Sequence, residues 1–451
     1  MRGVLIVGVI AVGIMFRPAF GQSVVDQASF RSMSLGGIHL YGVSVFSGYS
    51  TSAYPVGLGN TPLGAGQLGG DTSFGGSASL GWQYHRQRWN FSMMYSGTYG
   101  GMVRYSDANA FSQNLSLSAS RMLSPKWTLT FSGVSSDNTT VEFLYQPSSI
   151  GVVSQVPATM DDLAAAFSLG QFSGSQIAST LTGAPLLESP ARSLLLGDRI
   201  LSYSGQMGLN YAHSSRLSFH LASFAAGGQH RLNSSSVPEP NYLIPRTLGI
   251  NAGMGMAYML SPRTQVGLDV SGNRIDNRFQ AGYVTNANAS LGRKMGTHWF
   301  LTVHAGGSIN QVTSAYGNPK TKQIIGGGSI GFRTYQHTLV GSYERASADN
   351  YGLAVGSTTT LTAAWNWRRP GSRWNVFTSF GQQQVRDTGF ASFSGWQASG
   401  GIAQSLNSQM RMTAQYVYLS NSGEYLGYVS NLAVHSVRVS LSWAPQAWPA
   451  H

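Results

Sequence analysis

Short segments of alternating polarity recur along almost the whole chain from about Ile38 onward, and this feature restricts the fold most. In Ser77–Tyr84, for example, Ala78, Leu80 and Trp82 alternate with small polar residues or glycine. A period of two is the signature of a β-strand that has one apolar face and one polar face. The sequence therefore predicts an all-β protein built from many half-buried strands.

The composition separates two kinds of all-β protein. The polar positions of the alternating segments are mostly Ser, Thr, Asn, Gln and Gly, and charged residues make up only 10% of the chain. A soluble β-sandwich would carry more Lys and Glu on its wet face, whereas small neutral side chains suit strands that line a water-filled lumen. No stretch of about eighteen consecutive apolar residues follows the N-terminus, which excludes a bundle of transmembrane helices. The absence of Cys excludes disulfides and thiolate metal sites.

The N-terminus has the three parts of a secretory signal peptide. Arg2 supplies the positive charge, Val4–Phe16 the apolar core, and Ala19 and Gly21 the small residues of a cleavage site. The alternative is a single N-terminal anchor helix, for which this apolar run is short. We expect residues 1–21 to be a signal peptide, cut after Gly21, and residues 22–37 to form a periplasmic N-terminal arm.

The remaining chain predicts an antiparallel up-and-down transmembrane β-barrel of about 18 strands, with 16–18 plausible, over residues 38–443. The expected strand centres are Val43, Leu80, Met93, Leu117, Phe131, Gly205, Leu221, Met254, Leu268, Ala287, Val303, Gly328, Gly341, Leu361, Phe377, Gly400, Ala414 and Val439. Connections are expected to alternate between short inner turns and longer outer loops. The longest is loop 135–199, which either narrows or plugs the lumen or lies outside it as a lid or mobile loop. Residues 444–451 form a C-terminal tail.

Tryptophan predicts the orientation of this barrel. Eight of the ten tryptophans lie beside the proposed short turns or at the end of the last strand, and would form a periplasmic aromatic rim: Trp82, Trp89, Trp127, Trp299, Trp365, Trp367, Trp374 and Trp443. Indole rings favour a bilayer interface because they join an apolar body to one N–H donor. An even strand count then leaves both termini in the periplasm.

Charge supports the same orientation. The short turns contain Arg and Lys but no acidic residue: Arg86, Arg88, Lys126, Arg216, Arg263, Arg293, Lys294, Arg333, Arg368, Arg369 and Arg373. Most acidic residues fall in the proposed outer loops. The basic rim either faces anionic lipid headgroups or forms a funnel for anionic solutes. Because the basic residues are dispersed over many turns, without a basic helix or stripe, we expect no nucleic-acid partner.

Six polar or charged residues fall at the strand positions that alternation predicts to face the lumen. These candidate pore-lining residues are His220, Asp269, His304, Glu344, Arg411 and Arg438. An Arg on the lipid face at mid-depth would cost roughly 2–4 kcal/mol, which favours the inward placement. Opposite charges across a lumen would set ion selectivity. Alternatively, these groups pair with one another or with a plug and only stabilise the barrel.

No catalytic, cofactor-binding or metal site is indicated. Gly326–Gly331 matches two glycine motifs, G-x-G-x-x-G and G-x-S-x-G, but neither opens a helix after a buried parallel strand. The sequence contains no HExxH, paired-carboxylate or EF-hand spacing. We therefore predict that the chain is not an enzyme and needs no cofactor.

Taken together, the mature chain resembles a Gram-negative outer-membrane β-barrel of the porin-like kind. Val437–Trp443 is similar to the C-terminal signal of that class, which alternates hydrophobic residues and ends in an aromatic, although Ala444–His451 follow it here. The resemblance implies the outer membrane as location, and membrane lipid and the barrel-assembly machinery as partners. In general porins the loop after the fifth strand narrows the lumen, and loop 135–199 has a similar position.

Three functions remain open from the sequence. The first is a porin-like channel for passive passage of small hydrophilic solutes. The second is the barrel component of surface or exopolysaccharide export or anchoring, in which Tyr283, Phe300 and Phe377 would offer sugar-stacking surfaces. The third is an enzyme or adhesin on a plugged barrel. The sequence contains no plug domain of the kind used in TonB-dependent transport and does not indicate an oligomeric state.

Overall fold

The described strands form one closed, all-antiparallel barrel. The computed structural model describes residues 33–35, 38–51, 70–86, 88–104, 109–139, 199–232, 247–277, 280–314, 320–349, 355–369, 371–386, 391–425 and 428–445. The predicted signal peptide, most of the N-terminal arm, loop 135–199 apart from its ends, and most of the C-terminal tail lie outside these residues. No helix in the described ranges is long and apolar enough to cross a membrane.

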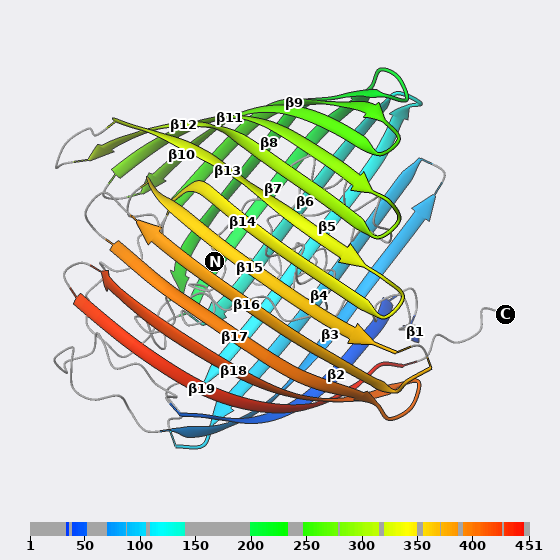
Figure 1. The fold of residues 1–451 in the computed structure, drawn as a ribbon, viewed down its shortest axis with the longest axis vertical. Helices are drawn as coiled ribbons and strands as arrows, with labels where there is room; N and C mark the ends of the chain where they lie inside the picture. Colours follow the sequence, from blue (N-terminus) through cyan, green and yellow to red (C-terminus); the bar gives the residue numbers. More distant parts are fainter. Residues whose placement is uncertain are drawn as a thin grey trace, which may run out of the picture.

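The strands follow one another around the ring in chain order (Figure 1). The first ten are β1 (Met33–Leu35), β2 (Ile38–Ser50), β3 (Asp71–Arg86), β4 (Trp89–Met102), β5 (Ala110–Ser124), β6 (Trp127–Thr139), β7 (Arg199–Ala212), β8 (Leu217–Leu232), β9 (Thr247–Ser261) and β10 (Thr264–Asn277). The others are β11 (Gln280–Met295), β12 (Trp299–Ser314), β13 (Lys320–Arg333), β14 (His337–Asp349), β15 (Val355–Arg368), β16 (Trp374–Arg386), β17 (Ala391–Ser405), β18 (Met410–Tyr425) and β19 (Tyr428–Trp443).

Pairing of β19 with β2, from Ser436↔Ser50 to Trp443↔Val43, closes the ring. The nineteenth strand of the sheet, β1, makes only a short hairpin with β2, so the wall itself consists of the eighteen strands β2–β19. This confirms the predicted porin-like barrel and its strand count, and each predicted strand centre lies in its own strand. β1 falls in the predicted N-terminal arm and was not expected.

The two rims of the barrel differ in their connections. Every turn that follows an odd-numbered strand from β3 to β17 is short, and β2 begins and β19 ends at this same short-turn rim (Figure 1). The opposite rim, which we call the long-connection rim, carries the gap between β6 and β7. The predicted alternation is not strict, however, because β10–β11 and β18–β19 are joined at that rim by only two residues each.

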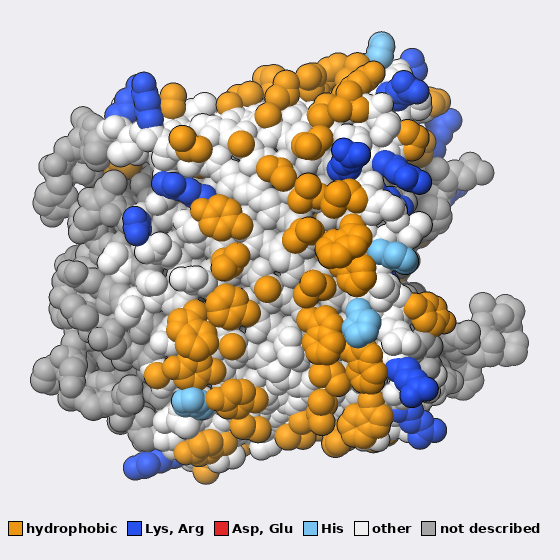
Figure 2. All heavy atoms as spheres, in the orientation of Figure 1, with side chains coloured by type: hydrophobic (Ala, Val, Ile, Leu, Met, Phe, Trp, Pro, Cys, Tyr) orange, Lys and Arg blue, Asp and Glu red, His pale blue; other side chains and the backbone are white. Residues whose placement is uncertain are grey.

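Side-chain alternation separates an apolar outer face from a polar inner face. Nearly all exposed large apolar side chains of the strands share one phase, as in Leu268 and Val270 of β10, and cover the outside of the wall (Figure 2). All of the buried polar side chains have the opposite phase, as in Thr302 and Ser308 of β12. The alternation seen in the sequence therefore corresponds to the two sides of a barrel wall.

On the inner face, several aromatic rings lie over glycines of the next strand. A Cβ at Gly331 of β13 would overlap the ring of Phe300, and one at Gly401 of β17 would overlap the ring of Phe377. Phe300 is only 1% exposed as a result. A glycine is required at these positions because the ring occupies the space of a side chain.

Candidate functional site: the inner wall of the barrel

The inner wall is lined mainly by hydroxyl and amide groups. Pairs of hydroxyls from neighbouring strands share hydrogen bonds, among them Ser44–Ser77 at 2.7 Å, Ser92–Ser118 at 2.7 Å and Ser379–Ser399 at 2.6 Å. Ser342 and Thr362 form another such pair. These pairs tie adjacent strands together on the inner face, beside smaller apolar contacts such as Val284 with Val312.

Other inner-wall polar atoms have no hydrogen-bond partner among the described residues. They are hydroxyls and side-chain amides of strands all around the ring: Ser79, Ser96, Ser116, Gln206, Asn273, Asn286, Asn288, Thr302, Asn310, Ser329, Asn375 and Gln397. Polar groups shielded from bulk solvent require a partner. The inner wall thus offers donors and acceptors to water or to a polar solute.

Three of the predicted pore-lining residues, Asp269, His304 and Glu344, lie on one arc of the inner wall, over β10–β14. We call them the acidic cluster. His304 of β12 donates from Nε2 to Oε1 of Glu344 of β14 at 3.1 Å. Gly327 of β13 pairs with both residues in the register and, lacking a side chain, lets them meet across the intervening strand. Asp269 of β10 lies close enough to His304 for an electrostatic interaction.

A matching glycine lies beside Asp269. A Cβ at Gly255 of β9 would overlap the Asp269 carboxylate, so the carboxylate rests in the space that this glycine leaves. Neither Gly255 nor Gly327 attracts notice in a sequence that contains 56 glycines. The local sequence gives no sign of these roles, because each depends on the register with a strand that is distant in the chain.

A different arc of the inner wall carries the basic residues. Arg411 lies on β18 and Arg438 on β19, which are four and five strands from Glu344 on β14 and eight and nine strands from Asp269 on β10 in the ring of eighteen. The guanidinium of Arg438 stacks over the ring of Phe46 of β2, with 3.6 Å between Cζ and the ring centroid. The structure thus places the acidic cluster and the two arginines on different arcs of the wall.

His220, the sixth predicted pore-lining residue, lies beside the acidic arc, because it pairs in register with Gly255, the glycine of β9 that also pairs with Asp269. It faces inward from β8, where its Nδ1 donates to Oδ1 of Asn210 of β7 at 2.5 Å. A register shift between His220 and Ser223, where β8 pairs with β9, interrupts the regular alternation there. Neither the shift nor Asn210 was predicted.

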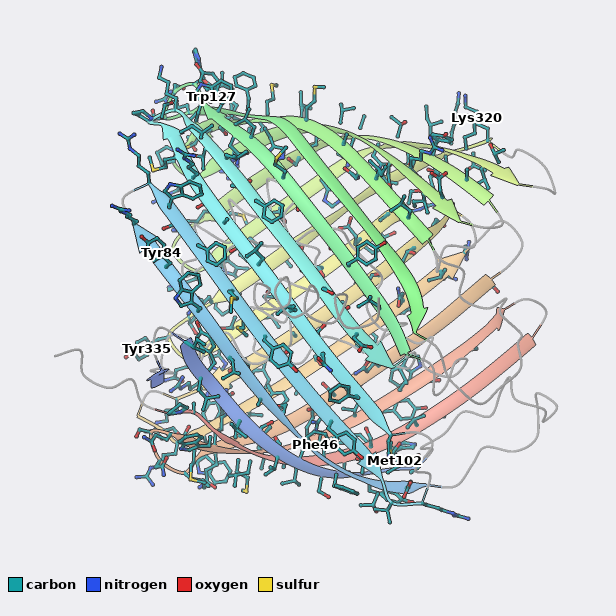
Figure 3. All side chains as sticks on the ribbon, turned by 180° about the vertical axis from the view of Figure 1, so that it is seen from behind. Phe46, Tyr84, Met102, Trp127, Lys320 and Tyr335 are labelled. Carbon is teal, nitrogen blue, oxygen red and sulfur yellow. The ribbon has the colours of Figure 1, made fainter. Side chains whose placement is uncertain are left out.

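All eight predicted rim tryptophans lie at or near the short-turn end of their strands and point to the outer face. Several make specific contacts there. Trp89 lies under the guanidinium of Arg121 at 4.6 Å, Trp299 packs on Phe332 at 4.5 Å between ring centroids, and Trp365 donates from Nε1 to Nδ1 of His337 at 3.3 Å. Figure 3 shows Trp127 at this rim and Lys320 at the opposite one.

Three aromatic residues considered for sugar stacking do not form a platform in the lumen. Tyr283 lies on the outer face of β11, where the guanidinium of Arg274 covers its ring at 5.3 Å. Phe300 and Phe377 do face inward, but they are buried against Gly331 and Gly401. The expected stacking role is therefore wrong for Tyr283, because its ring lies outside the lumen. It is also wrong for Phe300 and Phe377, because their rings are buried against glycines and are not available to a sugar.

The glycine motif Gly326–Gly331 lies within strand β13 and opens no helix. In the described part of the chain, no group of three or more His, Asp or Glu residues is arranged to hold a metal ion.

No protein-family model matches this sequence, and no curated protein matches it either. Solved structures from Pseudomonas aeruginosa share the barrel at low similarity. OccK1 (OpdK) is 10% identical, with 91% of this chain and 98% of that chain covered and a TM-score of 0.44. OccK2 (OpdF) in complex with glucuronate is 12% identical, with 91% and 99% covered and a TM-score of 0.44. At this distance no residue can be matched to a residue, so the roles below rest on the geometry of this chain.

Proposed function

We propose that this chain is an outer-membrane channel through which small hydrophilic solutes diffuse passively. The observation that carries the proposal is the inner wall: a closed ring of eighteen strands whose inward side chains are mainly hydroxyls and amides, with a few charges and some buried apolar residues. Rings of 16–18 strands enclose an aqueous channel. The polar atoms without a protein partner favour a wet lumen, because water would satisfy them. Diffusion needs no cofactor and no catalytic group.

The outer face supports a membrane setting. Its exposed Val, Leu, Ile and Met side chains suit hydrocarbon, and Lys and Arg gather towards the two rims (Figure 2). We assign the short-turn rim, with the eight tryptophans and both ends of the barrel, to the periplasm. Arg and Lys at this rim would attract anionic headgroups. Val437–Trp443, seated between β18 and β2, would be the segment that the assembly machinery reads.

The two arcs of the inner wall supply the selectivity in this proposal. Asp269 and Glu344 give one arc of the lumen negative charge, while Arg411 and Arg438 give another arc positive charge. A charged solute passing between them experiences a transverse field, whose strength rises where water is restricted. The hydrogen bond of His304 to Glu344 holds that carboxylate in a fixed position on the wall.

The alternative, export or anchoring of a polysaccharide, would rest on aromatic stacking surfaces in the lumen. Tyr283, Phe300 and Phe377 do not supply them, so no observation favours this function over diffusion.

The deciding experiment is single-channel recording of the refolded mature protein in a planar bilayer. A matched variant replaces residues 141–197 by a short Gly/Ser linker, which is sterically feasible because Thr139 pairs with Arg199 across the gap. We expect stepwise conductance in both proteins. Silence in the full chain with large steps in the variant would assign the 135–199 loop as a plug, whereas silence in both, with the barrel folded, would refute the diffusion channel.

Orientation is tested separately, because the chain has no Cys and accepts single reporter thiols cleanly. Tyr335→Cys places a thiol in a short turn, where the side chain is 85% exposed, and Val103→Cys places one at the long-connection rim, 65% exposed. With a membrane-impermeant maleimide on intact cells, we expect labelling of Val103→Cys and labelling of Tyr335→Cys only after the outer membrane is opened. The reverse pattern would invert the assigned topology.

A further inference from the structure

Near the long-connection rim, the ladder between β13 and β14 is interrupted. The closure of the ring is also incomplete at this rim, since β19 begins at Tyr428 but pairs with β2 only from Ser436 onward. Strands β13 and β14 pair only from Gly326↔Arg345 to Arg333↔Thr338, although β13 extends back to Lys320 and β14 continues to Asp349. By comparison, β11 and β12 pair with each other over the full length of both strands. Residues 320–325 therefore have a β12 neighbour on one side and no strand partner on the other in the described structure.

A side-chain contact shows how the strands separate. Ser347 of β14 donates its hydroxyl to Oδ1 of Asn310 of β12 at 2.9 Å, although β13 lies between these strands in the ladder. Asn310 is an inner-wall residue, only 2% exposed. The end of β14 thus passes on the lumen side of β13, and the end of β13 overhangs it on the outside.

The overhang carries an unusual set of outward side chains. Lys320 and Lys322 lie on the outer face of β13, where they pair in register with Gln311 and Ile309 of β12, and Arg345 lies on the outer face of β14 where the ladder ends. All three are exposed. Ile324 between them is 76% exposed, far more than its apolar neighbours on the wall. We call Lys320, Lys322, Ile324 and Arg345 the overhang patch.

The three cations of the overhang patch have no acidic partner among the described residues. Arg274, by contrast, occupies the same rim and the same face on β10, but its guanidinium bonds Asp276 at 2.8 Å. Among the described residues on the face that Figure 2 draws, no Asp or Glu side chain is visible. Cations at a membrane interface without counter-charges attract anionic headgroups, and phosphate accepts several charge-assisted hydrogen bonds at once.

The strand edge adds a second kind of donor. Residues 320–325 have no β14 partner in the described structure, and a free strand edge presents backbone N–H groups in alternation with C=O groups. Backbone N–H groups and cationic side chains that converge on one place form an anion site. An exposed Ile324 beside them suits an acyl chain, so the patch combines the two parts of a phospholipid-like ligand.

We propose that the overhang patch binds a phosphate-bearing glycolipid of the outer leaflet, with its phosphates held by Lys320, Lys322 and Arg345 and an acyl chain against Ile324. The inference depends on the membrane orientation given under the proposed function. It differs from a general attraction of rims to lipid because it requires three particular cations at one interruption of the wall.

The test is native mass spectrometry of the detergent-solubilised mature protein with a bis-phosphorylated disaccharide lipid. The variant combines Lys320→Gln, Lys322→Gln and Arg345→Gln. The matched control combines Arg88→Gln, Lys126→Gln and Arg263→Gln, which removes the same charge from the short-turn rim. We expect the overhang variant to bind the lipid at least tenfold more weakly and the control to bind within twofold of the parent protein. The dephosphorylated lipid should bind all three proteins weakly.

Several outcomes would overturn the proposal. They are equal loss in the overhang variant and the control, equal binding of the phosphorylated and dephosphorylated lipid, or complete displacement by millimolar inorganic phosphate, which would indicate a free-anion site. Dimers of the chain that persist irrespective of lipid would instead assign the strand edge to pairing with a second copy. Unchanged single-channel conductance in the overhang variant keeps the channel function separate, and the thiol-labelling experiment separates a wrong orientation from a wrong ligand.

Discussion

The two faces of the barrel wall are built from the same strands but follow different rules. On β12 the outward residue Val303 is 43% exposed, as suits a side chain that faces lipid. One position away, the inward residue Thr302 is only 1% exposed, and His304 bonds Glu344 two strands further on. The outer face requires mainly apolar side chains at its outward positions, whereas the inner face depends on which residues the neighbouring strands place beside each position.

This difference explains why alternation alone was enough to find the strands. Lipid acts as a uniform solvent, so every outward position is under the same requirement and the pattern repeats from strand to strand. The inner wall is set by register, since a hydroxyl or carboxylate meets whichever residue the next strand places opposite it. Changes on the two faces should therefore fail in different ways.

The largest effect should come from placing a charge on the lipid side. Leu361 and Thr360 are neighbours near the middle of β15, the first outward and the second inward. We expect Leu361→Arg to reduce the free energy of unfolding by about 2–4 kcal/mol, the cost of Arg at mid-depth, and Thr360→Arg by less than about 1 kcal/mol. Urea unfolding of the two variants in lipid vesicles measures both values. An equal decrease in the free energy of unfolding for the two variants would mean that the outer and inner faces are not exposed to different surroundings.

A second contrast uses glycines. Gly331 supports the Phe300 ring on the inner face, whereas Gly307 on the outer face of β12 has no atom within 4 Å of where a Cβ would lie. We expect Gly331→Val to cost about 1–3 kcal/mol, because the ring must leave its place, and Gly307→Val to be neutral within about 0.5 kcal/mol. The same unfolding assay tests this pair. A neutral Gly331→Val would show that the inner face repacks as freely as the outer one.

A third contrast lies within the inner face, between its acidic and basic arcs. A unit charge about 4 Å from a passing ion is worth about 1 kcal/mol in water-like surroundings, so removal of one charge should change the cation-to-anion permeability ratio about fivefold and removal of two up to about thirtyfold. Asp269→Asn with Glu344→Gln should shift the reversal potential towards anion preference. Arg411→Gln with Arg438→Gln should shift it towards cation preference. Shifts in the same direction, or none, would remove these residues from the conduction path.

The sequence predicted the fold well because its signals are local. Alternation located all eighteen wall strands, and interfacial chemistry located Trp299 and Trp443 at one rim. What it could not supply depends on cross-strand register: the room that Gly327 leaves for His304 and Glu344, the side of the wall taken by Tyr283, and the register shift beside His220. The interruption between β13 and β14 lies at Gly326, the first of three consecutive glycines, which permit a bend but do not specify where the strands separate.

The smallest effect concerns the rim, where the outer face does use a specific partner. Trp365 donates its indole N–H to Nδ1 of His337 at 3.3 Å, whereas no hydrogen bond of Trp396, on the outer face of β17, occurs among the described contacts. Phe is smaller than Trp, so both substitutions lose ring area, but only Trp365→Phe also loses a hydrogen bond. A net hydrogen bond is worth about 0.5–1.5 kcal/mol. We expect Trp365→Phe to cost more than Trp396→Phe by about that amount.

A double-mutant cycle isolates the bond from the ring. In a His337→Phe background, Trp365→Phe should cost only the lost ring area, because the acceptor is already gone, and the coupling energy should be about 0.5–1.5 kcal/mol, the value of the hydrogen bond. The free energy of unfolding in lipid vesicles is again the readout. If the cost of Trp365→Phe is unchanged in the His337→Phe background, the indole is held by the interface alone, and the rim then follows the same solvent-like rule as the rest of the outer face.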